Sequence, residues 1–237
     1  MKILNILIIT ILITGCAIKE NDNFLVKGLK HTINSPLYLG LVIETTLMIA
    51  IATPFYLAKK MSNKDIKALQ KKAESNDEAA QRELADMYYY GNNIDKDYKK
   101  AFMWYEKSAM QNNDYSQNML GIMYRFEYGV KKDINKSILW YNKSIEQGNI
   151  YAMNNLGHLY MMGDDGIEKN YEKALKLFTV SEKQGNDAAM YNLGIMYENG
   201  YGVEKNSILA LSWYQKSSDK GNKNAKRKIL ALNNPKT

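Results

Sequence analysis

Residues 187–222 read DAAMYNLGIMYENGYGVEKNSILALSWYQKSSDKGN, and residues 114–149 read DYSQNMLGIMYRFEYGVKKDINKSILWYNKSIEQGN. Both stretches contain Leu-Gly-x-x-Tyr, then a glycine-containing loop, then Trp-Tyr, and both end in Gly-Asn. Self-similarity at a fixed period of this length is typical of repeat architectures. Further copies of the same unit are therefore expected elsewhere in the chain.

Two further copies complete a series of four. The leucine of the motif recurs at Leu84, Leu120, Leu156 and Leu193, so the spacings are 36, 36 and 37 residues. The one-residue excess lies in the third loop, Gly163 to Ile167, where it leaves the flanking helices in phase. The four units are residues 78–113, 114–149, 150–186 and 187–222.

Each unit carries two apolar stripes with the period of an α-helix. In the third unit Ala152, Leu156 and Tyr160 form one stripe, glycines interrupt the chain, and a second stripe runs from Ala174 to Ser181. A closing glycine is typical of a helix end. The sequence therefore predicts an all-α fold, an α-solenoid of four helix-turn-helix repeats of 36–37 residues.

Flanking segments are predicted to cap this array. Residues 62–77 read as an N-terminal capping helix, and residues 223–237 as a C-terminal capping helix and tail. The basic cluster in the latter is interpreted as a solvated cap, with anionic headgroups or phosphate as the alternative. It consists of Lys223, Lys226, Arg227 and Lys228.

Three units place a glycine in the middle of their first helix. Gly121, Gly157 and Gly194 occupy this position, where glycine costs about 1 kcal/mol relative to alanine. We expect a second helix to approach closely at each glycine, and Ala85 to serve less tightly in the first unit.

The combined pattern A-x-x-x-L-G-x-x-Y-x-x-G-x-G-V-x-x-D/N-x-x-K-A-x-x-W-Y-x-K-S resembles the Sel-1-like repeat, a relative of the tetratricopeptide repeat. The resemblance covers residues 64–233 and implies an α-solenoid that binds proteins. Glu127 and the pair Leu177-Phe178 depart from the pattern. Some secreted members carry a disulfide in each repeat and are linked to β-lactam binding. No repeat of this chain contains cysteine, which makes that activity doubtful here.

The N-terminus has the features of a lipoprotein signal. Lys2 precedes an apolar run, Ile3 to Ile13, that is too short to span a bilayer and suits a secretory signal. It ends in Ile-Thr-Gly-Cys, which resembles a lipobox and implies lipid attachment at Cys16. Residues 1–15 would be the signal peptide and residues 16–35 a linker. Ala17 follows Cys16, so the aspartate that acts as a retention residue in the bacterial sorting pattern is not present. In this respect the sequence resembles a lipoprotein that is routed to the outer membrane.

A second apolar segment leaves the topology open. Residues 37–58, within a hydrophobic segment at 36–61, contain one charge, Glu44, and are long enough to span a membrane. Lysines that follow it would then place the repeats in the cytoplasm, at the inner membrane. The alternative is a buried or membrane-surface helix, with lipid-anchored repeats in the periplasm of the bacterial envelope.

Charge and residue counts exclude several classes of function. The net charge is +7, but residues 62–237 hold 26 basic and 22 acidic side chains. A nucleic-acid binder would show a concentrated basic face, so we expect no nucleic-acid partner. Cys16 is the one cysteine, and His31 and His158 are the two histidines. These counts exclude a cysteine zinc site and a three-histidine metal centre, and we expect neither metal nor cofactor.

The repeats contain no convincing catalytic set. His158 is their one histidine, and its repeat equivalents Asp86, Ile122 and Ile195 differ in chemistry. We therefore interpret it as a surface or groove residue. The pair Asp164-Asp165 reads as a solvated loop, with a weak cation site as the alternative. No phosphate-loop, zinc-protease or serine-nucleophile motif is present, and the chain is predicted not to be an enzyme.

One face of each first helix changes from unit to unit. In helix-pair solenoids the first helices line the concave surface, where aromatic residues make good binding hot spots. This variable face is rich in aromatic and methionine side chains in the second and third units. The residues predicted to bind a partner are Tyr115, Met119, Ile122, Phe126, Tyr151, Asn155, His158, Met162, Tyr191 and Ile195. The alternative is that they pack between neighbouring helices or against residues 37–58.

The leading interpretation is a non-catalytic protein–protein interaction scaffold, membrane-anchored through Cys16, that binds a protein or peptide in its groove. The resemblance adds a narrower alternative, a periplasmic immunity protein, because Sel-repeat lipoproteins recur beside secreted phospholipase effectors. An enzyme that acts on cell-wall material or hydrolyses β-lactams is disfavoured, because no catalytic base and no cysteine within a repeat is present.

Overall fold

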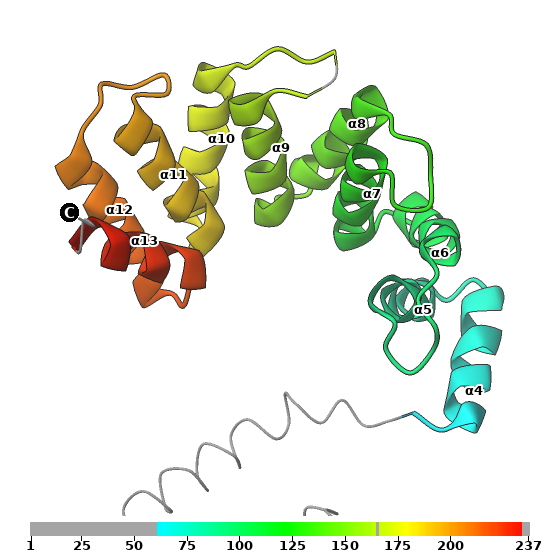
Figure 1. The fold of residues 1–237 in the computed structure, drawn as a ribbon. Helices are drawn as coiled ribbons and strands as arrows, with labels where there is room; N and C mark the ends of the chain where they lie inside the picture. Colours follow the sequence, from blue (N-terminus) through cyan, green and yellow to red (C-terminus); the bar gives the residue numbers. More distant parts are fainter. Residues whose placement is uncertain (1–60, 165, 234–237) are drawn as a thin grey trace, which may run out of the picture. The chain divides into compact units, whose positions relative to one another are not determined.

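The computed structural model of this chain describes residues 61–164 and 166–233. All regular elements in these residues are helices, apart from one isolated bridge between Asp164 and Ile167 (Figure 1). They are α4 (Asn63–Glu74), α5 (Glu78–Tyr90), α6 (Tyr98–Met110), α7 (Asp114–Phe126), α8 (Ile134–Glu146), α9 (Ile150–Met162), α10 (Tyr171–Lys183), α11 (Asp187–Asn199), α12 (Ser207–Asp219) and α13 (Lys223–Asn233). The predicted all-α class is confirmed.

The helices alternate between two roles. α5, α7, α9 and α11 are the first helices of the four units, and α6, α8, α10 and α12 are the second helices. Each first helix packs on the second helix of its own unit, which in turn contacts the first helix of the next unit. Figure 1 shows the pairs following one another from α5 to α12, with α4 before them and α13 after them. This arrangement is the predicted α-solenoid.

Aspartate or asparagine begins every helix of the four units. In α9 the side-chain oxygen of Asn149 accepts a hydrogen bond from the backbone N–H of Ala152 at 2.9 Å. Such a cap satisfies an N–H that the helix itself cannot, and its loss costs about 1 kcal/mol. The other capping residues are Asp77, Asp97, Asn113, Asp133, Asn170, Asn186 and Asn206.

The first helices of three units end in a left-handed residue. Gly91 and Gly200 have φ values of 75° and 74°, and Glu127 occupies the same position with φ 60°. A residue with a Cβ pays about 1–2 kcal/mol for this conformation. The departure of Glu127 from the repeat pattern is therefore unfavourable for the local backbone.

The mid-helix glycines lie against aromatic rings of the second helices, so the predicted close approach of a second helix is confirmed. A Cβ added to Gly121 would come within 2.5 Å of the Tyr141 ring, and one added to Gly194 within 2.5 Å of the Tyr214 ring. Gly157 has the same relation to the ring of Phe178, at 2.8 Å. Each ring belongs to the second helix of the same unit and is fully buried. Phe178, in the pair Leu177-Phe178, therefore fills the core position that tyrosine holds elsewhere.

The leader, Cys16, the linker and the apolar segment up to residue 60 lie outside the described residues. Within residues 61–164 and 166–233, each helix is too short or too polar to cross a membrane.

Candidate partner-binding face

Three first helices end with a large apolar side chain at the same repeat position. Tyr90 in α5, Phe126 in α7 and Met162 in α9 are 52%, 51% and 50% exposed. Tyr151, near the start of α9, is 61% exposed. We call Tyr90, Phe126, Tyr151 and Met162 the candidate partner-binding face.

The ten side chains predicted to bind a partner differ in exposure. Phe126, Tyr151 and Met162 are exposed, and Met119 is buried at 4% exposure. The remaining six are half-buried: Tyr115, Ile122, Asn155, His158, Tyr191 and Ile195. The structure thus brings only part of the predicted set to the surface.

Tyr115 is held in a polar network at the junction of the first two units. Its hydroxyl donates a hydrogen bond to Asp86 Oδ1 at 3.0 Å, and the Tyr105 hydroxyl donates to the same atom at 2.5 Å. Arg82 Nη1 lies 3.1 Å from Asp86 Oδ2. Burial, followed by the negative charge of Asp86, raises the pKa of both tyrosines above the usual value. These groups stabilise the junction.

Amide pairs join the first helices. Asn155 Nδ2 of α9 donates to Asn118 Oδ1 of α7 at 2.9 Å, and Asn192 Nδ2 of α11 donates to Asn154 Oδ1 at 2.9 Å. In the last unit the ring of Tyr191 lies 5.5 Å from that of Tyr214. Asn155 and Tyr191 therefore have structural contacts of their own.

A charged cluster joins the second and third units beside Phe126. Arg125, which is 7% exposed, has its Nε 3.4 Å from Asp164 Oδ2, and Lys132 Nζ is 2.6 Å from Asp164 Oδ1. Arg125 Nη2 lies 3.3 Å from His158 Nδ1. Burial and, secondly, the positive charge of Arg125 lower the pKa of His158.

Arg125 also lies close to a fully buried tyrosine. The Tyr141 hydroxyl forms no hydrogen bond of normal geometry within the described part of the chain. Burial raises the pKa of Tyr141 to about 12, while the charge of Arg125 opposes the increase.

Arg125 and Lys132 are absent from the predicted set, and Asp164 was expected in a solvated loop. Two sequence features coincide with the cluster, an arginine in a chain that mostly uses lysine and the one-residue excess in the third loop, but neither identifies the residues that come together. Tyr90 is a further exposed residue that is not among the ten predicted to bind a partner.

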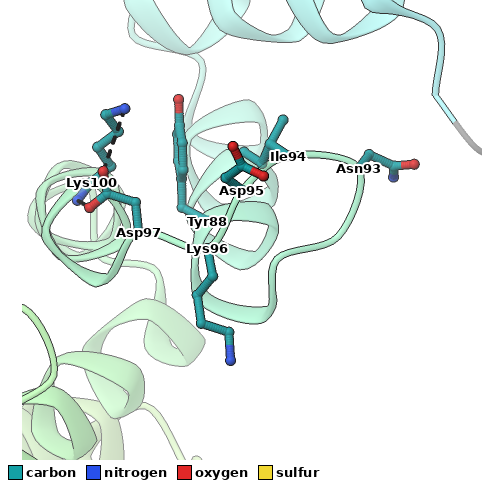
Figure 2. Close-up of a pocket in the computed structure, with 7 residues that line it drawn as sticks. All are labelled: Tyr88, Asn93, Ile94, Asp95, Lys96, Asp97 and Lys100. Atoms are coloured by element: carbon teal, nitrogen blue, oxygen red, sulfur yellow. Dashed lines mark hydrogen bonds and ion pairs between the residues drawn. The ribbon is translucent and has the colours of Figure 1, made fainter.

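A separate hollow of about 460 Å³ opens at the loop between α5 and α6 (Figure 2). Asp97 there accepts a hydrogen bond from the Lys100 backbone N–H at 3.0 Å and lies 3.4 Å from Lys100 Nζ. The backbone bond, as the largest cause, lowers the pKa of Asp97. Lys100 also lies over the ring of Tyr88. These contacts cap the N-terminus of α6. We therefore interpret the residues that line the hollow as structural.

Within residues 61–164 and 166–233, no three side chains of histidine, cysteine, aspartate or glutamate gather in a way that could hold a metal ion. The candidate face carries exposed apolar side chains, and the buried cation Arg125 lies beside one of them, Phe126.

The family model described as the Sel1 repeat matches residues 78–113, 114–149, 150–186 and 187–222. The chain belongs to the Sel1 repeat family. Proteins with Sel1 repeats are scaffolds for protein interactions and are generally non-catalytic.

Solved structures of other Sel1 repeat proteins are similar to this one. A Sel1 repeat protein from Oxalobacter formigenes is 35% identical with a TM-score of 0.60, and the match covers 65% of this chain and 63% of that one. A protective antigen present in uropathogenic Escherichia coli strains, with an SLR fold, is 32% identical with a TM-score of 0.59, covering 73% and 37% of the two chains.

An immunity protein from Pseudomonas aeruginosa is 30% identical with a TM-score of 0.49, and the match covers 68% of this chain and 59% of that one. This Sel1 repeat chain therefore spans less than two thirds of each of these three proteins. No curated protein sequence matches it.

Proposed function

We propose that this chain is a non-catalytic scaffold that binds a protein or peptide partner across α5, α7 and α9. The observation that carries the proposal is the line of Tyr90, Phe126 and Met162, which stand at one repeat position and are all half-exposed. Large apolar and aromatic side chains become binding hot spots when a partner covers them. The three side chains stand in register on successive first helices.

The second helices offer no comparable line. Val180 in α10 is 41% exposed, but the matching positions of the other units hold lysine. Leu139 in α8 is 52% exposed, and its equivalent Met103 is 41% exposed, but Lys176 and Ser212 hold that position in the last two units. Exposed apolar residues on that side are therefore scattered, which favours the first helices as the binding side.

Panning a phage-displayed library of random peptides on the purified repeats tests this proposal. We expect the enriched peptides to lose binding to a Phe126→Ser variant by a factor of about 30, which corresponds to roughly 2 kcal/mol at a hot spot. Leu139→Ser is the matched control, because Leu139 is exposed to the same extent on a second helix. Peptides that bind all three proteins equally would contradict the proposal.

We also propose that Cys16 is lipidated and that the repeats lie in the periplasm. The support is the short apolar run that ends in the lipobox-like sequence at residues 13–16. A Cys16→Ser protein is expected to lose lipid labelling and to accumulate as the unprocessed precursor. A reporter fused after Thr237 that functions only in the cytoplasm would instead favour a membrane-spanning segment at residues 37–58.

The immunity function stays a narrower prediction from the sequence. Co-expression of this chain with a toxic effector encoded beside it tests the idea directly. Protection that is lost in the Phe126→Ser variant would make the effector the partner. Absence of protection would exclude this narrower function and leave the scaffold proposal to the peptide experiment.

A further inference from the structure

Arg125 is a deeply buried cation at the edge of the candidate partner-binding face. Its guanidinium carbon lies 5.0 Å from the centre of the Phe126 ring. Within the described part of the chain it forms two polar contacts of hydrogen-bond length, Nε to Asp164 at 3.4 Å and Nη2 to His158 at 3.3 Å. Bonds between a guanidinium and a carboxylate are usually about 2.7–2.9 Å long. The contact with Asp164 is therefore long and weak.

The guanidinium consequently keeps unused donors. It carries five N–H groups in a planar fork that matches a carboxylate. Asp164 serves it poorly, because Lys132 Nζ holds the other carboxylate oxygen of Asp164 at 2.6 Å. A buried cation with incomplete hydrogen bonding is costly, so a better acceptor brought by a partner would be favoured.

Among the described residues of the cluster, the positive charges of Arg125 and Lys132 outnumber the one negative charge of Asp164. A carboxylate that arrives at Arg125 is therefore attracted by two cations and repelled by one carboxylate.

The chain also uses arginine sparingly. Arg82, Arg125 and Arg227 are its three arginines among 32 basic side chains. Arginine differs from lysine in binding carboxylates through two parallel bonds. An arginine at this buried position, in a chain that mostly uses lysine, is consistent with a need for that geometry.

On the basis of the proposed function, we propose that Arg125 receives a carboxylate of the partner in competition with Asp164. The recognised segment is a peptide with aspartate or glutamate next to a large apolar side chain. The apolar side chain packs on Phe126 or Met162, and the carboxylate takes the unused donors of Arg125.

Panning the random peptide library on the wild-type protein tests the inference. We expect enriched peptides to carry an acidic residue beside an apolar one. The Arg125→Gln variant, or replacement of the acidic residue of the peptide by its amide, is expected to weaken binding about tenfold, as for the loss of a charged hydrogen bond. In the Arg125→Gln variant the amide peptide should bind no worse than the acidic peptide.

Two further variants separate recognition from a merely structural role. Asp164→Asn removes the competing carboxylate, so affinity for the acidic peptide is expected to rise several-fold. Should Arg125→Gln fail to fold, Arg125→Lys keeps the charge without the fork and is expected to reduce affinity. Arg227→Gln, on the exposed surface of α13, is the control and should leave binding unchanged.

The outcomes distinguish this inference from the proposed function. Enriched peptides without an acidic residue, or acidic peptides that bind Arg125→Gln as well as wild type, would overturn the role of Arg125 and leave the scaffold proposal intact. An Asp164→Asn variant with reduced affinity would also overturn it. If no peptide is enriched over the Phe126→Ser protein, both proposals fail.

Discussion

The ring of Tyr171 lies parallel to the ring of Tyr201, with their centres 5.0 Å apart and their planes within 2°. Tyr171 begins the second helix of the third unit, and Tyr201 lies in the loop of the fourth. Tyr98 and Tyr128 stack in the same way between the first two units, at 4.8 Å and 16°. Two of the three junctions between units are thus closed by stacked aromatic rings.

The central junction is different because Ile134 and Asp164 occupy the two positions that tyrosines hold elsewhere. Asp164 there contacts Lys132 and Arg125. Electrostatic contacts replace the ring stack, so this junction depends on charge and on the ionic strength of the solvent.

Asp164→Asn is expected to lower the free energy of unfolding by about 1.5–3 kcal/mol, the range for a hydrogen bond to a charged group. Because salt screens such contacts, the difference between variant and wild type should shrink as salt is added. Urea unfolding at low and high salt measures both effects. Tyr201→Leu is the control, and its cost should not depend on salt. An Asp164→Asn protein as stable as wild type at low salt would contradict this account.

Glu127→Gly is expected to stabilise the protein by about 0.5–1 kcal/mol, because glycine adopts the left-handed conformation at φ 60° without strain. Glu127 is exposed, so few contacts are lost. Thermal unfolding of the purified repeats measures the change. Glu127→Ala keeps the strain and serves as the control. A glycine variant less stable than the alanine variant would show that the side chain, not the backbone, decides stability here.

Phe126→Ala and Tyr151→Ala are each expected to cost less than about 1 kcal/mol of stability, as exposed positions usually do. Leu156→Ala, at 3% exposure, should cost about 2–5 kcal/mol through lost packing. Urea unfolding of the three variants compares them directly. If the exposed positions prove as costly as Leu156, these side chains are covered in the full chain and the partner binds elsewhere.

His158 makes stability depend on pH. Burial and Arg125 lower its folded-state pKa below the unfolded value of about 6.5. The unfolded chain therefore binds the proton first, so stability is full above about pH 6.5 and is lost as the pH falls toward the lower folded-state value. His158→Gln should make the melting temperature less dependent on pH between about pH 7.5 and 5.5. An equal slope in both proteins would assign the dependence to other groups.

The repeat pattern was sufficient to predict the helices and the close approach of a second helix at the mid-helix glycines, because both depend on residues within one unit. It did not predict that aromatic rings make these contacts. Exposure on the variable face was harder to predict. Met119 is buried and Met162 is half-exposed, although both are methionines of that face. Met119 lies in the middle of α7, where neighbouring helices cover it, while Met162 is the last residue of α9. Burial here depends on packing between units.

The charged cluster could not be derived from the sequence for a related reason. Asp164 reads as one of two adjacent acidic residues in a loop, and its partners Arg125 and Lys132 lie 39 and 32 residues earlier. Only the folded course of the loop from Gly163 to Ile167 brings them together. Single-sequence periodicity contains no information on such a contact.

The contact between Gly121 and the Tyr141 ring also bears on how the chain folds. Its two residues are 20 positions apart in sequence, and those of Gly194 and Tyr214 are equally close. Contacts of such low sequence separation favour fast folding. In a linear array, stability is the sum of terms within units and between neighbours. A weakened central junction would therefore divide one cooperative transition into two, with amide protons on either side of Asp164 exchanging as separate groups.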